Sequence, residues 1–238
     1  MIDEGFARQA LAGCVLFAGV DADAMGTCLA LLRVRRFRRD ETVFHQGDPG
    51  DALHVIARGR VKIVLPSPDA GEPAILATLG AGDFFGELAL LDGEPHSASV
   101  VALEQTETLM LGRADFERLF DSEPRLRRAL VGSLAHELRR LTGHVEALHF
   151  MDLRERLALR IAELAGGGDG AAADGPARVG ELRLAWPYTQ SELAGMVGGS
   201  RESVNRLLAD FVARGLIRFE RDELVVPDLA RLTREARR

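Results

Sequence analysis

The sequence predicts an α+β chain with a strand-rich N-terminal part, one long helix, and a C-terminal helix-turn-helix followed by a hairpin. Three observations predict it. Short apolar runs between glycine-rich turns fill residues 34–111, an apolar repeat runs through residues 130–148, and two helical patterns meet at Gly198 and Gly199. We place the domain boundaries at 1–122, 123–151 and 152–238.

The composition is that of an ordinary globular chain, with 47% hydrophobic and 28% charged residues among 238. The longest apolar stretch, residues 11–20, is shorter than the roughly 18 residues that a membrane span needs, so we expect no membrane partner. That stretch also lacks the pattern of a signal peptide, which predicts a cytoplasmic protein. Cys14 and Cys28 are too few for a disulfide framework, and we expect them to be small buried side chains.

The N-terminal part is predicted to be a β-sandwich or barrel covered by helices. Residues 53–56 and 61–65 are apolar and β-branched, and glycine turns follow at short intervals. Many short strands at this spacing are typical of a sandwich or barrel. Residues 6–32 have helical patterning and are expected to pack against the sheet.

The predicted long helix, residues 123–149, carries a narrow apolar stripe. From Leu134 onward the stripe repeats every three and four residues, as in a coiled-coil seam. The opposite face is rich in Arg, Glu and His, which favours a parallel dimer over a helix buried on its own domain. The residues of the stripe are Leu130, Leu134, Leu138, Leu141, Val145 and Leu148.

The C-terminal part has the outline of a winged helix-turn-helix. A helix beginning at Leu153 precedes a flexible glycine-rich loop. The segments that follow are a strand at 179–186, helices at 189–197 and 200–214, and a hairpin at 217–226.

The second of the two short helices is a candidate for reading DNA. Its exposed N-terminal face carries Arg201, Glu202 and, one turn later, Arg206. In a major groove Arg donates to guanine O6 and N7, and Glu accepts from cytosine N4. Thr189 and Ser200 are suited to cap the two helices, where phosphates also bind. The alternative is a surface helix with solvated charges.

The segment Gly199-Ser200-Arg201-Glu202-Ser203-Val204-Asn205-Arg206 resembles the recognition helix of the Crp/Fnr regulators. The resemblance extends over nearly the whole chain. It implies a bacterial homodimeric transcription regulator with an N-terminal cyclic-nucleotide-binding β-roll (a jelly roll), a long dimerisation helix and a winged helix. It also implies base contacts from Arg201, Glu202 and Arg206, phosphate contacts from Thr189, Ser200 and Ser203, a palindromic TGTGA-like site, and RNA polymerase as a further partner.

A second segment, residues 82–98, resembles the phosphate-binding cassette of cyclic-nucleotide domains. The resemblance implies that Gly86, Glu87 and Leu88 cradle the ligand, that Glu87 accepts from a ribose hydroxyl, and that Ser97 contacts the phosphate. The family's Arg is replaced by His96. The position of its base-contacting hydroxyl corresponds to Thr142, although a helical Thr is more often simply solvated.

The replacement of Arg by His96 leaves the effector open. Arg is always charged and binds two phosphate oxygens, whereas His is mostly neutral at pH 7. Weak cyclic-AMP binding, a different nucleotide such as cyclic di-GMP, and a pocket that binds nothing are the alternatives, and we rank cyclic-nucleotide binding first.

Other functions fit the sequence less well. A haem sensor could use His45, His54, His136, His144 or His149, but none has a paired spacing. We recognise no catalytic motif, so we expect no enzyme. A signalling module whose C-terminal domain docks a protein is the alternative from another class.

The net charge of −6 comes from the N-terminal part. Residues 178–238 hold 11 Arg and 9 acids, a net charge of +2, so the preceding residues carry −8.

Overall fold

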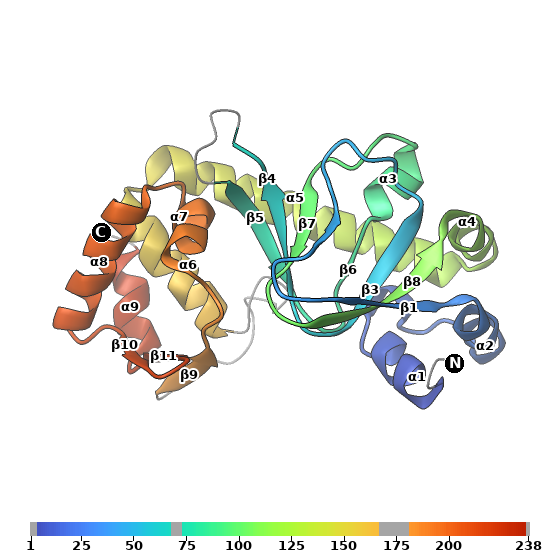
Figure 1. Cartoon of the computed structure of the whole chain (residues 1–238), viewed down its shortest axis with the longest axis horizontal. Coiled ribbons are helices and arrows are strands. Elements are labelled where there is room, and N and C mark those ends of the chain that lie inside the picture. The colour runs from blue at the N-terminus through green and yellow to red at the C-terminus, as the bar shows by residue number, and fades with distance from the viewer. Residues whose placement is uncertain (1–3, 68–72, 167–180, 237–238) are drawn as a thin grey trace. The chain divides into compact units, whose positions relative to one another are not determined.

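The computed structural model describes residues 4–67, 73–166 and 181–236 (Figure 1). These residues belong to two compact units, one within residues 1–64 and 78–140 and the other within residues 65–77 and 141–238. Each unit has buried apolar residues of its own. None of the described helices is long and apolar enough to cross a membrane.

Two four-stranded sheets make up the N-terminal β-roll in the described chain, with strand orders β1-β8-β3-β6 and β2-β7-β4-β5. The strands are β1 (Arg33–Phe37), β2 (Thr42–Phe44), β3 (Ala52–Arg58), β4 (Val61–Leu65), β5 (Ala74–Leu79), β6 (Phe84–Phe85), β7 (Ser99–Ala102) and β8 (Thr106–Gly112). Ile56 and Phe85 from the first sheet form one buried cluster with Val61 and Val100 from the second. The two sheets therefore pack face to face, and the predicted sandwich is confirmed.

Helices cover the outer side of the first sheet. The predicted helical segment at 6–32 consists of α1 (Glu4–Ala12), a short 3-10 helix (Val15–Phe17) and α2 (Ala22–Leu31). These helices and α4 (Arg113–Ser122) share a core cluster with Leu53 and Leu109. Cys14 and Cys28 are free thiols inside this cluster, as expected, and burial raises their pKa values to about 11 and about 12.

The long helix α5 (Pro124–Phe150) confirms the predicted helix but changes the membership of its apolar stripe. Leu130 is only 1% exposed and belongs to the core cluster, so its assignment to the stripe is wrong. Val131 is 65% exposed and takes its place. The corrected stripe alternates steps of three and four residues throughout: Val131, Leu134, Leu138, Leu141, Val145 and Leu148.

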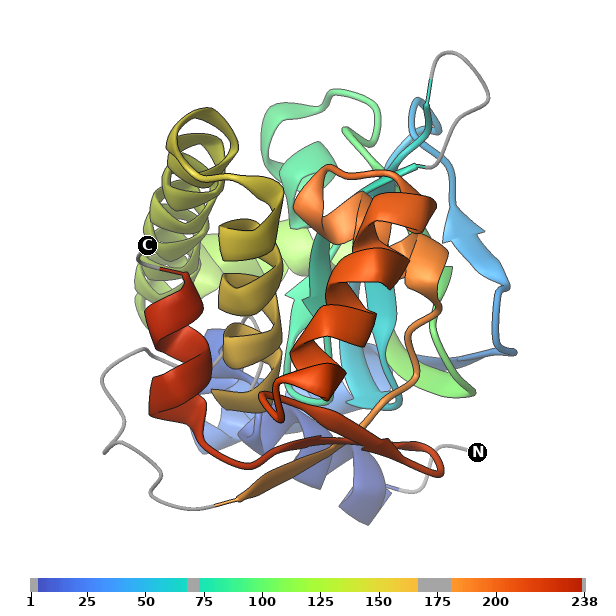
Figure 2. The same cartoon turned by 90° about the vertical axis from the view of Figure 1, so that its left-hand side faces the viewer.

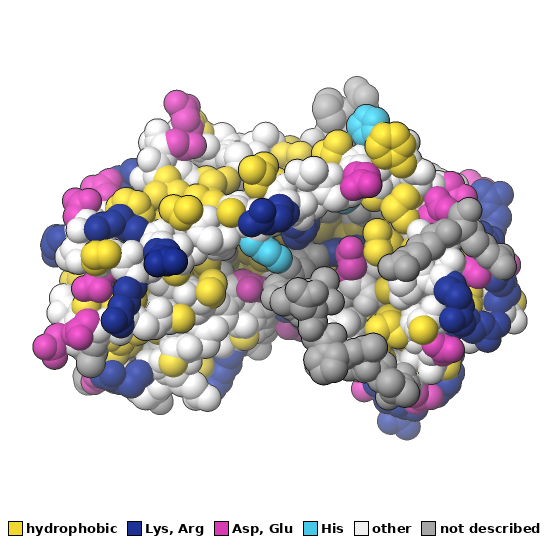
Figure 3. Space-filling view, turned by 180° about the vertical axis from the view of Figure 1, so that it is seen from behind, with side chains coloured by type: hydrophobic (Ala, Val, Ile, Leu, Met, Phe, Trp, Pro, Cys, Tyr) yellow, Lys and Arg dark blue, Asp and Glu magenta, His cyan; other side chains and the backbone are white. Residues whose placement is uncertain are grey.

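The stripe is accessible in the single chain. Leu138 is 67% exposed and Val145 is 53% exposed, although Leu134 partly packs against the core cluster. Figure 3 shows hydrophobic side chains gathered on the surface along the region where α5 runs. An unbroken repeat of this kind is the pattern that lets two helices pack knobs into holes.

The C-terminal unit has the predicted winged helix-turn-helix. Its three-stranded antiparallel sheet has the order β10-β11-β9 and lies below α6, α8 and α9 in Figure 2. The elements are α6 (Leu153–Gly166), β9 (Leu182–Ala185), α7 (Gln190–Val197), α8 (Arg201–Ala213), β10 (Arg218–Glu220), β11 (Glu223–Val226) and α9 (Leu229–Glu235). The glycine-rich loop expected after Gly166 and the start of the strand expected at 179 lie outside the described residues.

The terminal helix α9 was not predicted. It is joined to α8 by charged groups, because both Nη atoms of Arg214 donate to the buried carboxylate of Glu235 at 2.7 Å. Arg154 on α6 donates to Asp210 on α8 at 2.6 Å. These ion pairs connect residues far apart in the sequence, which a pattern of local periodicity does not reveal.

Candidate nucleic-acid interface and effector pocket

The helix α7 begins at a capping residue, and a glycine turn connects it to α8. Thr189 accepts from the backbone N–H of Glu192, and the Glu192 side chain accepts from the N–H of Thr189, which is a capping box. Gly198 ends α7 with a φ of 64°, a conformation that glycine adopts without strain. A Cβ on Gly199 would lie 2.6 Å from Leu153 Cδ1, so the turn approaches α6 closely.

The helix α8 separates a buried face from an exposed one. Val204, Leu208 and Phe211 are buried against the unit's core. Arg201, Glu202 and Arg206 are all exposed, so the structure brings the three candidate base-reading residues together on one face. Their spacing of one, four and five positions places them within about two turns of the helix.

The three candidate phosphate-contacting hydroxyls lie at helix N-termini. Ser200 caps α8 by accepting from the backbone N–H of Ser203, and its hydroxyl donates to the Ser203 hydroxyl at 3.0 Å. The Thr189 hydroxyl donates to Glu192 at 2.9 Å. These caps orient the first turns of both helices, whose N–H groups and positive dipole ends favour anions.

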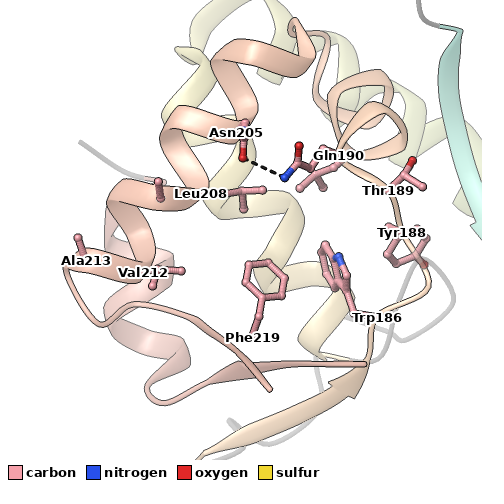
Figure 4. Close-up of a pocket in the computed structure, with 11 residues that line it drawn as sticks. Trp186, Tyr188, Thr189, Gln190, Asn205, Leu208, Val212, Ala213 and Phe219 are labelled. Atoms are coloured by element: carbon pink, nitrogen blue, oxygen red, sulfur yellow. Dashed lines mark hydrogen bonds between the residues drawn. The ribbon is translucent and has the colours of Figure 1, made fainter. Parts of the chain in front are cut away.

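Two residues that the sequence did not single out lie beside this face. Gln190, the first residue of α7, donates from Nε2 to Asn205 Oδ1 at 2.9 Å. Figure 4 shows this bond at the edge of a pocket that extends toward Trp186 and Phe219. Both side chains are amides on exposed parts of the two helices, and their pairing depends on the tertiary packing of α7 against α8.

In the first unit, the candidate phosphate cassette surrounds the start of α3 (Glu87–Asp92). Gly86 has a φ of 89°, and a Cβ there would lie 2.7 Å from the carbonyl oxygen of Ala52. Both observations require glycine at this position. Burial, together with the nearby carboxylate of Glu137 on α5, raises the pKa of Glu87 to about 7, although a backbone hydrogen bond to the carboxylate acts in the opposite direction.

The side chain of His96 is buried and stacked. Its ring lies parallel to the ring of Phe44, with centroids 3.5 Å apart and an angle of 4° between the planes. Desolvation lowers the pKa of His96, and the charges of Asp48 and Asp51 oppose that effect. The imidazole is therefore mostly neutral at pH 7, and two carboxylates lie near the position where a phosphate-binding Arg is expected.

The remaining candidate effector residues are distributed around this cassette and on α5. Leu88 and Ser97 are exposed in the first unit. Thr142 is exposed on the part of α5 that belongs to the second unit.

His54, one of the histidines considered for a haem sensor, is buried and stacked on Phe85. Its Nδ1 lies 3.0 Å from the hydroxyl of Thr108, and burial lowers its pKa to about 4.

Comparison with protein families agrees with this architecture. Residues 34–123 match the cyclic nucleotide-binding domain, and residues 155–235 match the Crp-like helix-turn-helix domain. The combination defines the class: a transcription regulator with a ligand-binding-type β-roll and a DNA-binding winged helix.

Two similar proteins of known function indicate the family to which the chain belongs. The chain is 35% identical over 229 residues to a CRP-like cAMP-activated global transcriptional regulator of Mycobacterium tuberculosis, covering 96% of this chain and 99% of the relative. It is 33% identical to the cyclic AMP receptor protein of Thermus thermophilus, covering 87% and 89%. The chain belongs to the CRP family of DNA-binding transcription regulators, and the resemblance noted in the sequence is confirmed.

Solved structures show the same fold. The c-di-GMP responsive global regulator CLP of Xanthomonas campestris superposes with a TM-score of 0.71 at 25% identity, covering 87% of this chain and 99% of that one. A CRP-family transcriptional regulator of Thermus thermophilus superposes with a TM-score of 0.66 at 30% identity, covering 86% and 97%.

Proposed function

We propose that this regulator binds a palindromic operator as a homodimer, with one α8 helix in each of two successive major grooves. Arg201, Glu202 and Arg206 read bases in a half-site similar to TGTGA. The first turns of α7 and α8, with Thr189, Ser200 and Ser203, hold the phosphates. The observation that carries the proposal is the common exposed face of the three charged residues on a helix whose opposite face is buried.

Dimerisation is proposed to use the corrected stripe on α5, within residues 130–148. Its six apolar residues lie at alternating spacings of three and four, and several are more than half exposed in the single chain. A parallel pair of such helices relates the two winged helices by a two-fold axis. That symmetry matches a palindrome with half-sites one helical turn apart, about 34 Å.

We propose a cyclic nucleotide as the effector, held by Gly86, Glu87, Leu88, His96 and Ser97, with Thr142 on α5 as a further contact. Relatives named as cAMP-activated support this class of ligand, and the c-di-GMP responsive neighbour supports the alternative. A neutral, stacked His96 beside Asp48 and Asp51 supports weak binding of a phosphate.

We also propose that the regulator contacts RNA polymerase on DNA and that it is located in the cytoplasm. We assign it no catalytic role.

Binding to a fluorescent duplex with two TGTGA half-sites tests the DNA-binding part of this proposal. We expect the protein to prefer this duplex over one with scrambled half-sites, and Arg201→Ala to have a weaker preference while retaining nonspecific binding. Equal affinity of the unaltered protein for both duplexes would contradict base reading. The same assay with cyclic AMP, cyclic GMP and cyclic di-GMP identifies the effector by the ligand that changes the operator affinity.

A further inference from the structure

The exposed face of α8 continues beyond its charged residues into a surface groove. This α8 groove is bounded by Gln190, Asn205, Ala209, Val212, Trp186 and Phe219, and it has a volume of about 620 Å³ (Figure 4). A second hollow of about 490 Å³ is lined by Thr189, Gln190, Ser191 and Arg201. The two share Thr189 and Gln190, so the groove is continuous with the face that carries Arg201.

Asn205 lies in the middle of this face. It is four positions after Arg201, three after Glu202 and four before Ala209, and residues at these spacings are neighbours on a helix surface. Any duplex that places a base edge against Arg201 and Glu202 therefore brings an adjacent base pair close to Asn205.

The carboxamide of Asn205 is held in one orientation. Gln190 Nε2 donates to Asn205 Oδ1, so this oxygen is held toward Gln190. An amide oxygen can accept a second hydrogen bond, and the Nδ2 group of the same carboxamide can donate. A donor and an acceptor side by side match the N7 acceptor and N6 donor of adenine. Guanine presents two acceptors at the same edge, which suits Arg better than Asn.

The groove beyond Asn205 is apolar. Ala209 is exposed one turn further along α8, Val212 is 43% exposed, and Phe219 on β10 is 45% exposed. Phe219 packs edge-on against Trp186, with ring centroids 6.0 Å apart, which closes the groove on the side of the hairpin. The one apolar group that a base pair offers in the major groove is the C5-methyl of thymine.

We propose that the α8 groove reads an A·T base pair next to the pairs read by Arg201, Glu202 and Arg206. Asn205, positioned by Gln190, binds N6 and N7 of the adenine. Ala209 and Val212 contact the methyl group of the partner thymine. This inference rests on the proposed function, because it requires α8 in a major groove.

Base analogues test the assignment without changing the protein. In the symmetric TGTGA duplex, each adenine in turn is replaced by 7-deazaadenine, which lacks the N7 acceptor, and each thymine by uracil, which lacks the methyl group. We expect 7-deazaadenine to weaken binding at only one position of the half-site. Each of the two half-sites that carries the analogue there should reduce the affinity about 10-fold. Uracil at the same pair should weaken it about 3-fold.

Protein variants then connect these effects to residues. Asn205→Ala should bind the 7-deazaadenine and unmodified duplexes equally, while remaining sensitive to uracil. Val212→Ala should lose most of the uracil effect and keep the 7-deazaadenine effect. Gln190→Ala should reduce the 7-deazaadenine effect without abolishing it. Circular dichroism of each variant shows whether its fold is retained.

Three results would overturn the assignment. One is that the unaltered protein binds the operator but no analogue weakens binding. Another is that Asn205→Ala binds every duplex more weakly by the same factor, because Asn205 then only joins α7 to α8. Failure of the unaltered protein to prefer the TGTGA duplex would overturn the proposed function and this inference together.

Discussion

The α5 stripe makes a quantitative prediction for Leu138→Ala. Leu138 is 67% exposed in the single chain, and Val131 and Val145 lie one heptad away on either side. Burying a whole leucine side chain stabilises by about 2 kcal/mol, so losing the exposed part beyond Cβ forfeits about 1.5 kcal/mol per protomer. The dimer contains the substitution twice, which gives about 3 kcal/mol and a dimer dissociation constant about 100-fold higher.

Sedimentation equilibrium over a range of protein concentrations measures this dissociation constant directly. Val15→Ala is the matched control, because Val15 is 57% exposed but belongs to the N-terminal 3-10 helix and not to α5. We expect Val15→Ala to dimerise as the unaltered protein does. A Leu138→Ala dissociation constant within about 3-fold of that of the unaltered protein would refute the α5 interface.

Three further predictions concern the effector pocket. His96→Arg restores a permanent, bidentate charge and should tighten cyclic-AMP binding about 10- to 100-fold, measured by calorimetry. The pKa of Glu87 is raised from 4.5 to about 7, so its stabilising contribution is complete below pH 4.5 and is lost as the pH rises through 7. Above pH 7 the free energy of unfolding of Glu87→Gln, measured by urea denaturation, should therefore exceed that of the unaltered protein by up to about 3 kcal/mol. At about pH 4 the two proteins should have the same free energy of unfolding. Gly86→Ala should destabilise the fold by about 1–3 kcal/mol in the same urea assay.

Each of these predictions has its own contradiction. Unchanged cyclic-AMP affinity in His96→Arg would mean that the missing cation does not limit binding. A difference between Glu87→Gln and the unaltered protein that does not vary with pH would contradict the burial of a titrating carboxyl. Gly93 also has a positive φ, of 75°, but nothing within 4 Å of an added Cβ, so Gly93→Ala should be milder than Gly86→Ala.

Features that depend on neighbouring residues could be predicted from the sequence. The caps at Thr189 and Ser200 and the turn at Gly198 follow from local chemistry, and the structure has both caps and a left-handed Gly198. Helical spacing predicts which residues of α8 are exposed once its apolar residues are assigned to the buried face. These exposed residues include Arg201, Glu202 and Arg206. Periodicity was therefore sufficient to place these three residues on the exposed face, whereas their role in reading DNA rests on the family resemblance.

Features that depend on tertiary packing could not be predicted in the same way. Leu130 and Val131 are both apolar and adjacent, and only the core cluster on the first unit decides which of them is covered. The stack of His96 on Phe44 joins residues more than fifty positions apart, so the burial that lowers the pKa of His96 involves a residue distant in the sequence. The bond between Gln190 and Asn205 likewise depends on how α7 crosses α8.

Reading of DNA by α8 is tested most directly by selecting bound duplexes from a random pool, in parallel for the unaltered protein, Arg201→Ala and Arg206→Ala. We predict that the unaltered protein recovers a palindrome of two TGTGA-like half-sites centred about 10 base pairs apart. Each variant should lose the preference for a particular G·C pair in both half-sites. Recovery of the same palindrome by all three proteins, or of sequences without two-fold symmetry, would contradict base reading by a dimer through α8.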